Sequence, residues 1–358
     1  MASMNDVFVD YNAGTDSGAT AGTVGDPFQT LQYALDNTTR DADGDIFNIE
    51  DTSAQPIPAG GLNLDTGGSG YLNGGALSSA APIGFRGYSA AANDGGKATC
   101  EGTTNSAANM FSNGAIDYVY IKDLIFTGFS AECVNVRSYC SIDSCRFTNS
   151  AEAIDTNSYC WIHNNQLDTL SGSRGISALV SPHIWRNWIL IDAADGLGEC
   201  IWYNSLGATI SQNIISITGA ASTVGITVSQ NGGAIIGNTI DGGGLGTGQG
   251  IRFDASTHYA TIIANNIITN FGGTGGDAID LLSATTALSY YGGNAFYGNT
   301  NNETNFVDAA KFGNPATPDN EVLAVDPYLR HGANTFANRD HYWGTKPLGN
   351  LRGGAFAA

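Results

Sequence analysis

The chain has 358 residues, of which 48 are glycine, and only 13% of its residues are charged. Ordinary globular proteins contain about 25% charged residues and about 7% glycine. The 42% hydrophobic content excludes a disordered chain, which is rich in charge and poor in apolar residues. The 33 acidic and 14 basic residues give a net charge of -19, which repels nucleic acids and anionic membranes. Because the basic residues are scattered along the sequence, we expect neither nucleic acid nor a membrane as a partner.

The segment "GDPFQTLQYALD", residues 25–36, carries the signals of a short helix. Asp26 is a good helix cap, Pro27 suits the first helical position, and apolar residues recur on one face. We expect a helix from about residue 27 to about residue 36 that covers the open end of the region that follows.

A repeat of about 25 residues occupies the middle of the chain. Each copy has an aliphatic or aromatic residue, then most often an asparagine three positions later, and another apolar residue two positions after that. The copies are Ile121-Leu124-Phe126, Ile142-Cys145-Phe147, Ile162-Asn165-Leu167, Ile184-Asn187-Ile189, Ile210-Asn213-Ile215, Ile235-Asn238-Ile240, Ile263-Asn266-Ile268 and Tyr291-Asn294-Phe296. A second apolar element, such as Cys200-Ile201 or Gly225-Ile226, precedes every copy except the first.

Such short strands, separated by Gly, Asn and Ser turns, cannot bury their apolar face alone. If the copies stack as coils, each strand pairs with its equivalent in the next coil at about 4.8 Å, which gives three parallel sheets around a core. The asparagines then form a ladder in which each buried amide bonds the turn backbone and the next asparagine. A helical-repeat solenoid is disfavoured because the strong helix formers Glu, Lys, Gln and Arg are scarce.

The repeat pattern also divides the chain. We expect an N-terminal cap and first coil at 1–60, the parallel coils at 61–302, and an irregular C-terminal tail at 303–358 that packs on the coils. The tail is recognised by the loss of the repeat and by Pro315, Pro318, Pro327 and Pro347.

The aligned Asn187, Asn213 and Asn238, together with "GTDSGATAGTVGDPFQTLQYAL", resemble the right-handed parallel β-helix superfamily of pectate lyases, polygalacturonases and phage tailspikes. The resemblance covers about residues 5–300. It implies an all-β fold, a right-handed parallel β-helix of three sheets with an N-terminal capping helix and an irregular C-terminal tail. It also implies that a substrate groove lies on the strand one sheet before the asparagine, although one fold hosts many functions.

Two aspartates on that strand are candidate catalytic residues. Asp254 and Asp280 lie on adjacent coils, with Arg252 beside them. One coil step and two residues along the strand place their backbones about 8 Å apart, within the range of about 6.5–9.5 Å for an inverting glycosidase. The alternative is an ordinary surface ion pair between Arg252 and Asp280. The tight Asp-Asp and His-containing motifs of polygalacturonases are missing from the sequence.

Other positions suggest binding. Arg137 beside Asp155 partly matches the calcium, carboxylate and basic residue of a pectate lyase, with a structural ion pair as the alternative. Trp202 faces the same groove. The run "GGTGGDAID" fits one copy of the calcium-binding nonapeptide and makes Asp277 a candidate calcium ligand. We expect no other cofactor.

The outward positions around the asparagine corner form a stripe rich in aromatic and imidazole groups: Tyr120, Lys122, Asp143, Trp161, His163, His183 and Trp185. Exposed aromatic side chains in a row contact sugar rings or another subunit. We therefore add Trp161, His163, His183 and Trp185 to Trp202, Asp155 and Arg137 as candidate carbohydrate-binding residues. Contact with a second subunit or with the C-terminal tail is the alternative. His163 and His183 have no third ligand in register for zinc.

The cysteine count is even, at six, and Cys140 and Cys160 fall on neighbouring coils, where a disulfide is geometrically conceivable. Small buried thiols that fill the core are the favoured interpretation.

Two functions of different class fit these patterns. The first is a virion-associated or extracellular protein of tailspike or fibre type, mainly structural and adhesive, that contacts surface polysaccharide and assembles as a homotrimer. The absence of a secretory signal in "MASMNDVFVD", the few titratable groups and the aromatic stripe favour it. The second is a polysaccharide lyase or an inverting glycoside hydrolase that acts in the groove.

Overall fold

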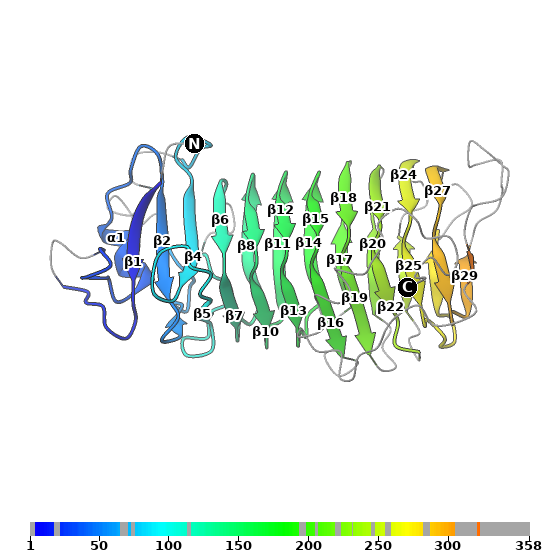
Figure 1. Ribbon diagram of the computed structural model, residues 1–358, viewed down its shortest axis with the longest axis horizontal. Coiled ribbons are helices and arrows are strands. Elements are labelled where there is room, and N and C mark those ends of the chain that lie inside the picture. Colours follow the sequence, from blue (N-terminus) through cyan, green and yellow to red (C-terminus); the bar gives the residue numbers. More distant parts are fainter. Residues whose placement is uncertain are drawn as a thin grey trace. The chain divides into compact units, whose positions relative to one another are not determined.

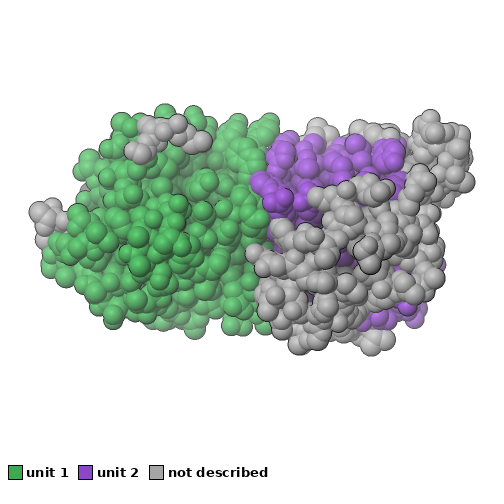
Figure 2. Space-filling model, viewed as in Figure 1, with its two compact units in different colours: residues 1–172 green, residues 173–358 purple. Residues whose placement is uncertain are grey.

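The chain is an all-β, right-handed parallel β-helix, as the repeat and the resemblance predict, and one short helix occurs among the described residues. The computed structural model describes residues 4–17, 22–64, 71–72, 76–112, 116–192, 198–204, 207–218, 223–230, 232–244, 248–254, 259–281, 287–304 and 321–322. The chain divides into two compact units, residues 1–172 and residues 173–358, which are green and purple in Figure 2.

Unit 1 contains three parallel sheets (Figure 1). Sheet 1 consists of β1 (Asn5–Val9), β2 (Asp45–Glu50), β4 (Ile83–Tyr88), β6 (Val119–Lys122), β9 (Ser141–Asp143) and β12 (Trp161–His163). Sheet 2 consists of β3 (Gln55–Pro56), β5 (Ala98–Glu101), β7 (Leu124–Thr127), β10 (Arg146–Thr148) and β13 (Gln166–Asp168). Sheet 3 consists of β8 (Glu132–Ser138) and β11 (Glu152–Ser158).

Unit 2 repeats the same three sheets. Sheet 1 consists of β15 (His183–Trp185), β18 (Ala208–Ser211), β21 (Gly233–Ile236), β24 (Tyr259–Ala264) and β27 (Ala287–Gly292). Sheet 2 consists of β16 (Trp188–Asp192), β19 (Ile214–Thr218), β22 (Thr239–Asp241), β25 (Ile267–Thr269), β28 (Ala295–Tyr297) and β30 (Glu321–Val322). Sheet 3 consists of β14 (Arg174–Val180), β17 (Glu199–Tyr203), β20 (Val224–Val228), β23 (Gln249–Phe253), β26 (Asp277–Asp280) and β29 (Asn301–Thr304).

The core of each unit is made of columns of identical or similar apolar residues. In unit 1, Ile121 pairs with Ile142, Ile142 pairs with Ile162, and all of them are fully buried. The rings of Phe126 and Phe147 stack with centroids 5.0 Å apart. Each such buried side chain contributes about 1.5–3 kcal/mol to the free energy of unfolding. In unit 2 the corresponding isoleucine column consists of Ile184, Ile210, Ile235 and Ile263.

A column of fully buried asparagines follows sheet 1 in unit 2. The Nδ2 of Asn213 donates to the Oδ1 of Asn238, and the Nδ2 of Asn238 donates to the Oδ1 of Asn266, each at 3.0 Å. The backbone N–H of each residue also donates to the Oδ1 of the next. Asn187 and Asn294 continue this pattern at its two ends. The side-chain amides therefore satisfy turn backbone that would otherwise be buried without partners.

The helix begins later than the sequence predicts. Helix α1 (Leu31–Asn37) has Thr30 as its N-cap, whose side chain accepts a hydrogen bond from the N–H of Tyr33. The expected cap, Asp26, and the first expected helical residue, Pro27, precede it in extended backbone, because Phe28 pairs with Val9 of β1. A long-range strand contact therefore overrides the local helix signals.

The C-terminal tail lies largely outside the described residues. Within 303–358, the structure describes the end of β29 and strand β30, which pairs with β28 through Phe296 and Val322. The expected boundaries of the cap, the coils and the tail remain predictions.

Candidate functional site

The outer face of sheet 1 in unit 1 carries the most distinctive surface of the described residues. Strands β6, β9 and β12 and the turn before each present every second side chain outward, which gives three parallel columns across three coils. We call this surface the outer grid. Its columns are Tyr118, Tyr139 and Tyr159; Tyr120, Ser141 and Trp161; and Lys122, Asp143 and His163.

The first column is a stack of tyrosine rings. The centroids of Tyr118 and Tyr139 are 5.1 Å apart with an interplanar angle of 12°, and those of Tyr139 and Tyr159 are 5.3 Å apart at 11°. Tyr139 and Tyr159 are each 45% exposed. Neighbouring rings therefore cover one another's faces and present their edges to solvent. Such pairs contribute about 0.5–1.5 kcal/mol beyond the area that they bury.

These tyrosines occupy a strained backbone position. Their φ angles are 57°, 57° and 54° in chain order, in the left-handed region. Bulky residues are rare there, because Cβ approaches the following carbonyl oxygen, at a cost of about 1–2 kcal/mol per residue. The same turn in unit 2 holds smaller residues, Ser181 (φ 46°), Gly207 (φ 83°) and Gly232 (φ 73°), which precede β15, β18 and β21. The turn itself therefore favours a small residue, and among the described residues large rings occupy it in the three coils of unit 1 named above.

The second column pairs two open aromatic side chains with a small residue between them. Ser141 is in register with Tyr120 on one side and Trp161 on the other. Tyr120 is 49% exposed and Trp161 is 42% exposed. Because the neighbour of each ring in the column is a serine, no other ring of that column stacks on either of them.

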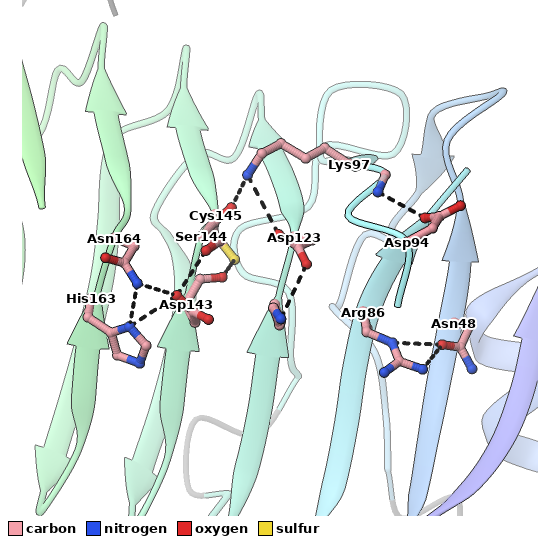
Figure 3. Close-up of polar contacts among 12 residues, drawn as sticks. Asn48, Arg86, Asp94, Lys97, Asp123, Asp143, Ser144, Cys145, His163 and Asn164 are labelled. Carbon is pink, nitrogen blue, oxygen red and sulfur yellow. Dashed lines mark hydrogen bonds and ion pairs between the residues drawn. The ribbon is translucent and has the colours of Figure 1, made fainter. Parts of the chain in front are cut away.

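The third column is polar and centred on Asp143 (Figure 3). The Nδ1 of His163 lies 3.0 Å from the Oδ1 of Asp143, and the Nδ2 of Asn164 donates to the same oxygen at 2.9 Å. Burial by itself raises the pKa of Asp143, but the hydrogen bonds and charge of His163 and the bond from Asn164 outweigh it and lower this pKa to about 2. Asp143 therefore carries a charge at any ordinary pH.

Basic residues that are scattered in the sequence gather beside this column (Figure 3). Arg86 is in register with Lys122, and Lys97 reaches Asp123 from the loop before β5. Every cation in this cluster has an acidic partner. The Nζ atoms of Lys97 and Lys122 lie 3.9 Å and 3.8 Å from the carboxylate of Asp123, and Arg86 lies 3.1 Å from that of Asp6. Together with Asp143, the carboxylates of Asp6 and Asp123 equal these three cations in number, so the cluster has no formal excess of positive charge.

Asp123 lies at the centre of the two lysines. Burial raises its pKa, while the charges of Lys122 and Lys97 act in the opposite direction. Its backbone is left-handed, with φ at 53°, at the turn between β6 and β7. This turn places the carboxylate of Asp123 within 4 Å of the ammonium groups of both lysines.

A second constellation lies in unit 2, on sheet 3. Glu199 accepts from the Nε of Arg174 at 3.0 Å through one oxygen and from Arg252 at 2.7 Å through the other. The guanidinium of Arg174 lies 3.8 Å above the ring of Trp202. A cation therefore partly covers the ring of Trp202. Arg252 forms an ion pair with Glu199, a residue that the sequence analysis did not single out.

The candidate catalytic aspartates lie on neighbouring strands of the same sheet. Arg252 of β23 is directly in register with Asp280 of β26, as the sequence predicts. Asp254 follows β23, is exposed, and accepts a 2.6 Å hydrogen bond from the Oγ of Ser229. Their roles as acid and base remain predictions.

The calcium site also remains a prediction. Asp277 is buried, and its Oδ1 accepts from the Nδ2 of Asn301 at 2.7 Å. Across the described part of the chain, no group of three or more His, Cys, Asp or Glu side chains is placed to hold a metal ion.

The other predicted binding residues lie outside the outer grid. Arg137, which is exposed, and Asp155 lie on β8 and β11 of sheet 3 in unit 1. His183, exposed, and Trp185, half-buried, lie on β15 in unit 2. Of the predicted carbohydrate-binding set, Trp161 and His163 are the two that belong to the outer grid.

Sequence reasoning missed the tyrosine column. The signal was present, because a tyrosine precedes the strands at Tyr120, Ser141 and Trp161 by two positions each time. These tyrosines lie in turns between strands, where alternation along a strand does not predict which way a side chain points.

The fold and the outer grid define a parallel β-helix protein with an aromatic outer face. Among the described residues no helix is both long and apolar enough to cross a membrane. No protein-family model matches the chain, and no curated protein sequence matches it.

The chain is similar to several solved structures, each at low sequence identity. GH136 lacto-N-biosidase from Eubacterium ramulus has a TM-score of 0.48 and 12% identity, over 89% of this chain and 67% of that chain. Alginate lyase from Paenibacillus sp. str. FPU-7 has a TM-score of 0.44 and 14% identity, over 82% and 94% of the two chains. A tailspike protein of E. coli bacteriophage HK620, in complex with a pentasaccharide, has a TM-score of 0.31 and 10% identity, over 78% and 71%.

Proposed function

We propose that this protein is a mainly structural and adhesive β-helix protein of the tailspike or fibre type, which contacts surface polysaccharide through the outer grid. In this proposal it works on a virion or outside the cell, where such polysaccharides are found. The observation that carries the proposal is the tyrosine column. Three bulky rings occupy a left-handed turn that holds serine or glycine in three coils of unit 2. Strain of this kind is typical of functional positions.

The chemistry of the outer grid suits a sugar. Sugar rings have apolar C–H faces that pack on aromatic rings, and burial of apolar surface stabilises the contact by about 25 cal/mol per Å². Their hydroxyl groups need hydrogen-bond partners at fixed positions. The exposed rings of Tyr120 and Trp161 offer the first, and the partly exposed Asp143 and His163 offer the second.

A binding assay with matched variants tests this proposal. Trp161→Ala removes an exposed ring, so we expect at least a tenfold loss of affinity for a polysaccharide that the wild-type protein binds. Tyr11→Ala removes another exposed ring of unit 1, away from the outer grid, and should leave the affinity unchanged. Isothermal titration calorimetry with a panel of bacterial surface polysaccharides provides the measurement, because its signal does not depend on the tryptophan that the variant removes. Equal loss in both variants, or no binding of any polysaccharide, contradicts the proposal.

The proposal includes assembly as a homotrimer, as in the sequence-based hypothesis. An aromatic surface with this exposure also suits contact with another subunit. The molar mass in solution, measured by light scattering, tests the assembly. A trimer that dissociates on Trp161→Ala would assign the outer grid to the subunit interface in place of a glycan.

Enzymatic degradation of a polysaccharide is the second candidate function. It is favoured by the placement of Asp254, Arg252 and Asp280 on adjacent strands of sheet 3 in unit 2. Release of reducing or unsaturated ends from a polysaccharide panel tests it. Loss of that activity in Asp254→Asn and Asp280→Asn supports the role of these residues, while unchanged activity removes them from the site.

A further inference from the structure

We infer that the ligand of the outer grid is an uncharged, extended, linear polysaccharide that runs across the strands, with one sugar for each coil. This inference rests on the proposed function and specifies the class and the direction of the glycan. Three observations on the outer grid carry it: the spacing of its columns, the free edges of the tyrosine stack, and the balance of charge around Asp123 and Asp143.

The spacing of the columns sets the repeat of the ligand. Equivalent side chains of adjacent coils are separated by about 4.8 Å, the distance between paired strands. The ring centroids of the tyrosine column follow this spacing, at 5.1 Å and 5.3 Å. A β-1,4-linked pyranose chain in its extended form advances by about this distance for each sugar. A coiled α-1,4-linked chain advances less and curves away from a straight row.

The tyrosine column can bind such a chain only by its edge. Because the rings stack on one another, the faces inside the stack are covered, and the exposed parts are the edges with their hydroxyl groups. None of the hydroxyls of Tyr118, Tyr139 and Tyr159 is engaged by another described residue. The stack therefore presents a straight row of equally spaced hydroxyl groups, which can each donate and accept a hydrogen bond.

The second column supplies the apolar contact beside this row. Tyr120 and Trp161 are two coils apart, so their separation along the column is about 9.6 Å, or two strand spacings. Ser141 between them is small and only 8% exposed, so it forms a low floor between two rings that are each more than 40% exposed. A chain that runs along the columns then meets a ring at one sugar, the serine at the next and a ring again at the third.

The charge balance selects an uncharged ligand. Asp143 pairs with His163 at 3.0 Å, Asp123 pairs with Lys97 and Lys122, and Asp6 pairs with Arg86. The three cations Arg86, Lys97 and Lys122 are matched in number by the carboxylates of Asp6, Asp123 and Asp143, so the described residues of this surface have no excess of positive charge for a carboxylate or a sulfate. The net charge of -19 adds a general repulsion for polyanions. The affinity of a neutral sugar depends neither on free cations nor on this repulsion.

Binding of matched hexasaccharides to the full-length protein tests the inference. Cellohexaose and chitohexaose are neutral and extended, maltohexaose is neutral but coiled, and a β-1,4-linked mannuronate hexamer is extended but acidic. We expect an extended neutral hexamer to bind at least tenfold more tightly than maltohexaose and the mannuronate hexamer. Within the extended neutral series, affinity should rise steeply from one sugar to three.

A single-atom variant tests the role of the hydroxyl row. Tyr139→Phe keeps the ring and its stacking but removes the central hydroxyl, so we expect about a fivefold loss of affinity for the extended hexamer. Tyr11→Phe makes the same change on another exposed tyrosine and should have no effect. Unchanged affinity in Tyr139→Phe overturns the assignment of the hydroxyl row.

The outcomes separate this inference from the proposed function. Equal or tighter binding of maltohexaose or the mannuronate hexamer, with loss in Trp161→Ala, overturns the inference and leaves the proposed function in place. If none of the hexamers and no surface polysaccharide binds, both are overturned.

Discussion

Tyr139 shows how one residue combines strain with exposure. Its φ of 57° lies in the region where glycine is unstrained and where an L-residue with a Cβ is not. Stacking against Tyr118 and Tyr159 offsets part of this cost. A glycine at this position relieves the strain but removes the ring. The residue is therefore explained less by folding than by what its ring does at the surface.

This strain can be measured directly. Tyr139→Gly and Tyr139→Ala lose the same ring contacts, but only the alanine keeps the strained Cβ. We expect the glycine variant to have a free energy of unfolding about 1 kcal/mol higher than the alanine variant. Urea denaturation of the two variants gives the difference. The same pair of substitutions at Ser158, in the regular strand β11, is the control and should show the reverse order.

Asp143 predicts a pH dependence of stability. Its pKa falls from the ordinary 3.8 to about 2 in the folded protein, so its stabilising contribution is complete above about pH 4 and is lost as pH falls toward 2. The contribution is on the order of 2 kcal/mol. We expect the difference in unfolding free energy between the wild type and Asp143→Asn to shrink between pH 5 and pH 2 as the carboxylate is protonated.

Nuclear magnetic resonance can follow the same group. The carboxyl carbon of Asp143 should titrate near pH 2, far below an ordinary aspartate. Asp51→Asn, which replaces an exposed carboxylate in the same unit, serves as the control for general charge effects in the denaturation series. A midpoint for Asp143 near its ordinary value would show that His163 and Asn164 do not hold the carboxylate in solution.

At the scale of the element, the asparagine column fixes the corner between sheets 1 and 2 in unit 2. The Oδ1 of Asn238 accepts from the backbone N–H and the Nδ2 of Asn213, and its Nδ2 donates to the carbonyl of Ile210. All of these groups belong to residues that are fully buried. Removing one amide therefore leaves several buried polar groups without their partner.

We expect Asn238→Ala to lower the free energy of unfolding by about 3 kcal/mol, because each buried group that loses its hydrogen bond costs about 1–3 kcal/mol. Asn12→Ala changes an exposed asparagine and should have an effect near zero. Chemical denaturation followed by circular dichroism measures both. A loss below about 1 kcal/mol for Asn238→Ala would mean that water replaces the amide inside the corner.

The strands and the inward columns were predictable because they depend on period alone. The spacing of Ile210, Ile235 and Ile263 in the sequence is the spacing of the coils, and alternation decides which neighbours face inward. The start of α1 was not predictable in this way. Its local signals point to Asp26, and only the pairing of Phe28 with β1 moves the helix to Leu31.

The site was predictable only in part, for the same reason. Trp161 and His163 follow from alternation along β12. The tyrosine stack depends on the conformation of a turn, and the meeting of Lys97 with Asp123 depends on a loop that belongs to another coil. A single sequence does not predict contacts between residues that are not related by the repeat.

At the scale of the whole molecule, the reactivity of the buried cysteines measures how often the core becomes accessible to solvent. All six are free and buried. Burial raises the pKa of Cys133 and Cys145 to about 12, so their thiols stay protonated and unreactive at neutral pH. Burial also raises the pKa values of Cys100 and Cys200 well above that of an ordinary thiol.

We expect no thiol of the native protein to react with a disulfide reagent within minutes, and six to react after unfolding in guanidinium chloride without reductant. Absorbance of the released thiolate gives the count. Four reactive thiols after unfolding would indicate that Cys140 and Cys160 are joined, which contradicts the free state described above. A fast reaction of the native protein would show that a coil opens readily.

The alternation of inward and outward side chains has a consequence for the history of such a chain. Inward columns of isoleucine and asparagine stabilise each coil, while the outward residues are nearly free of that duty. Substitutions can therefore change the whole outer face without disturbing the inward columns. Divergence of this kind changes the outward half of the positions first. The fold is then conserved after sequence identity has become low.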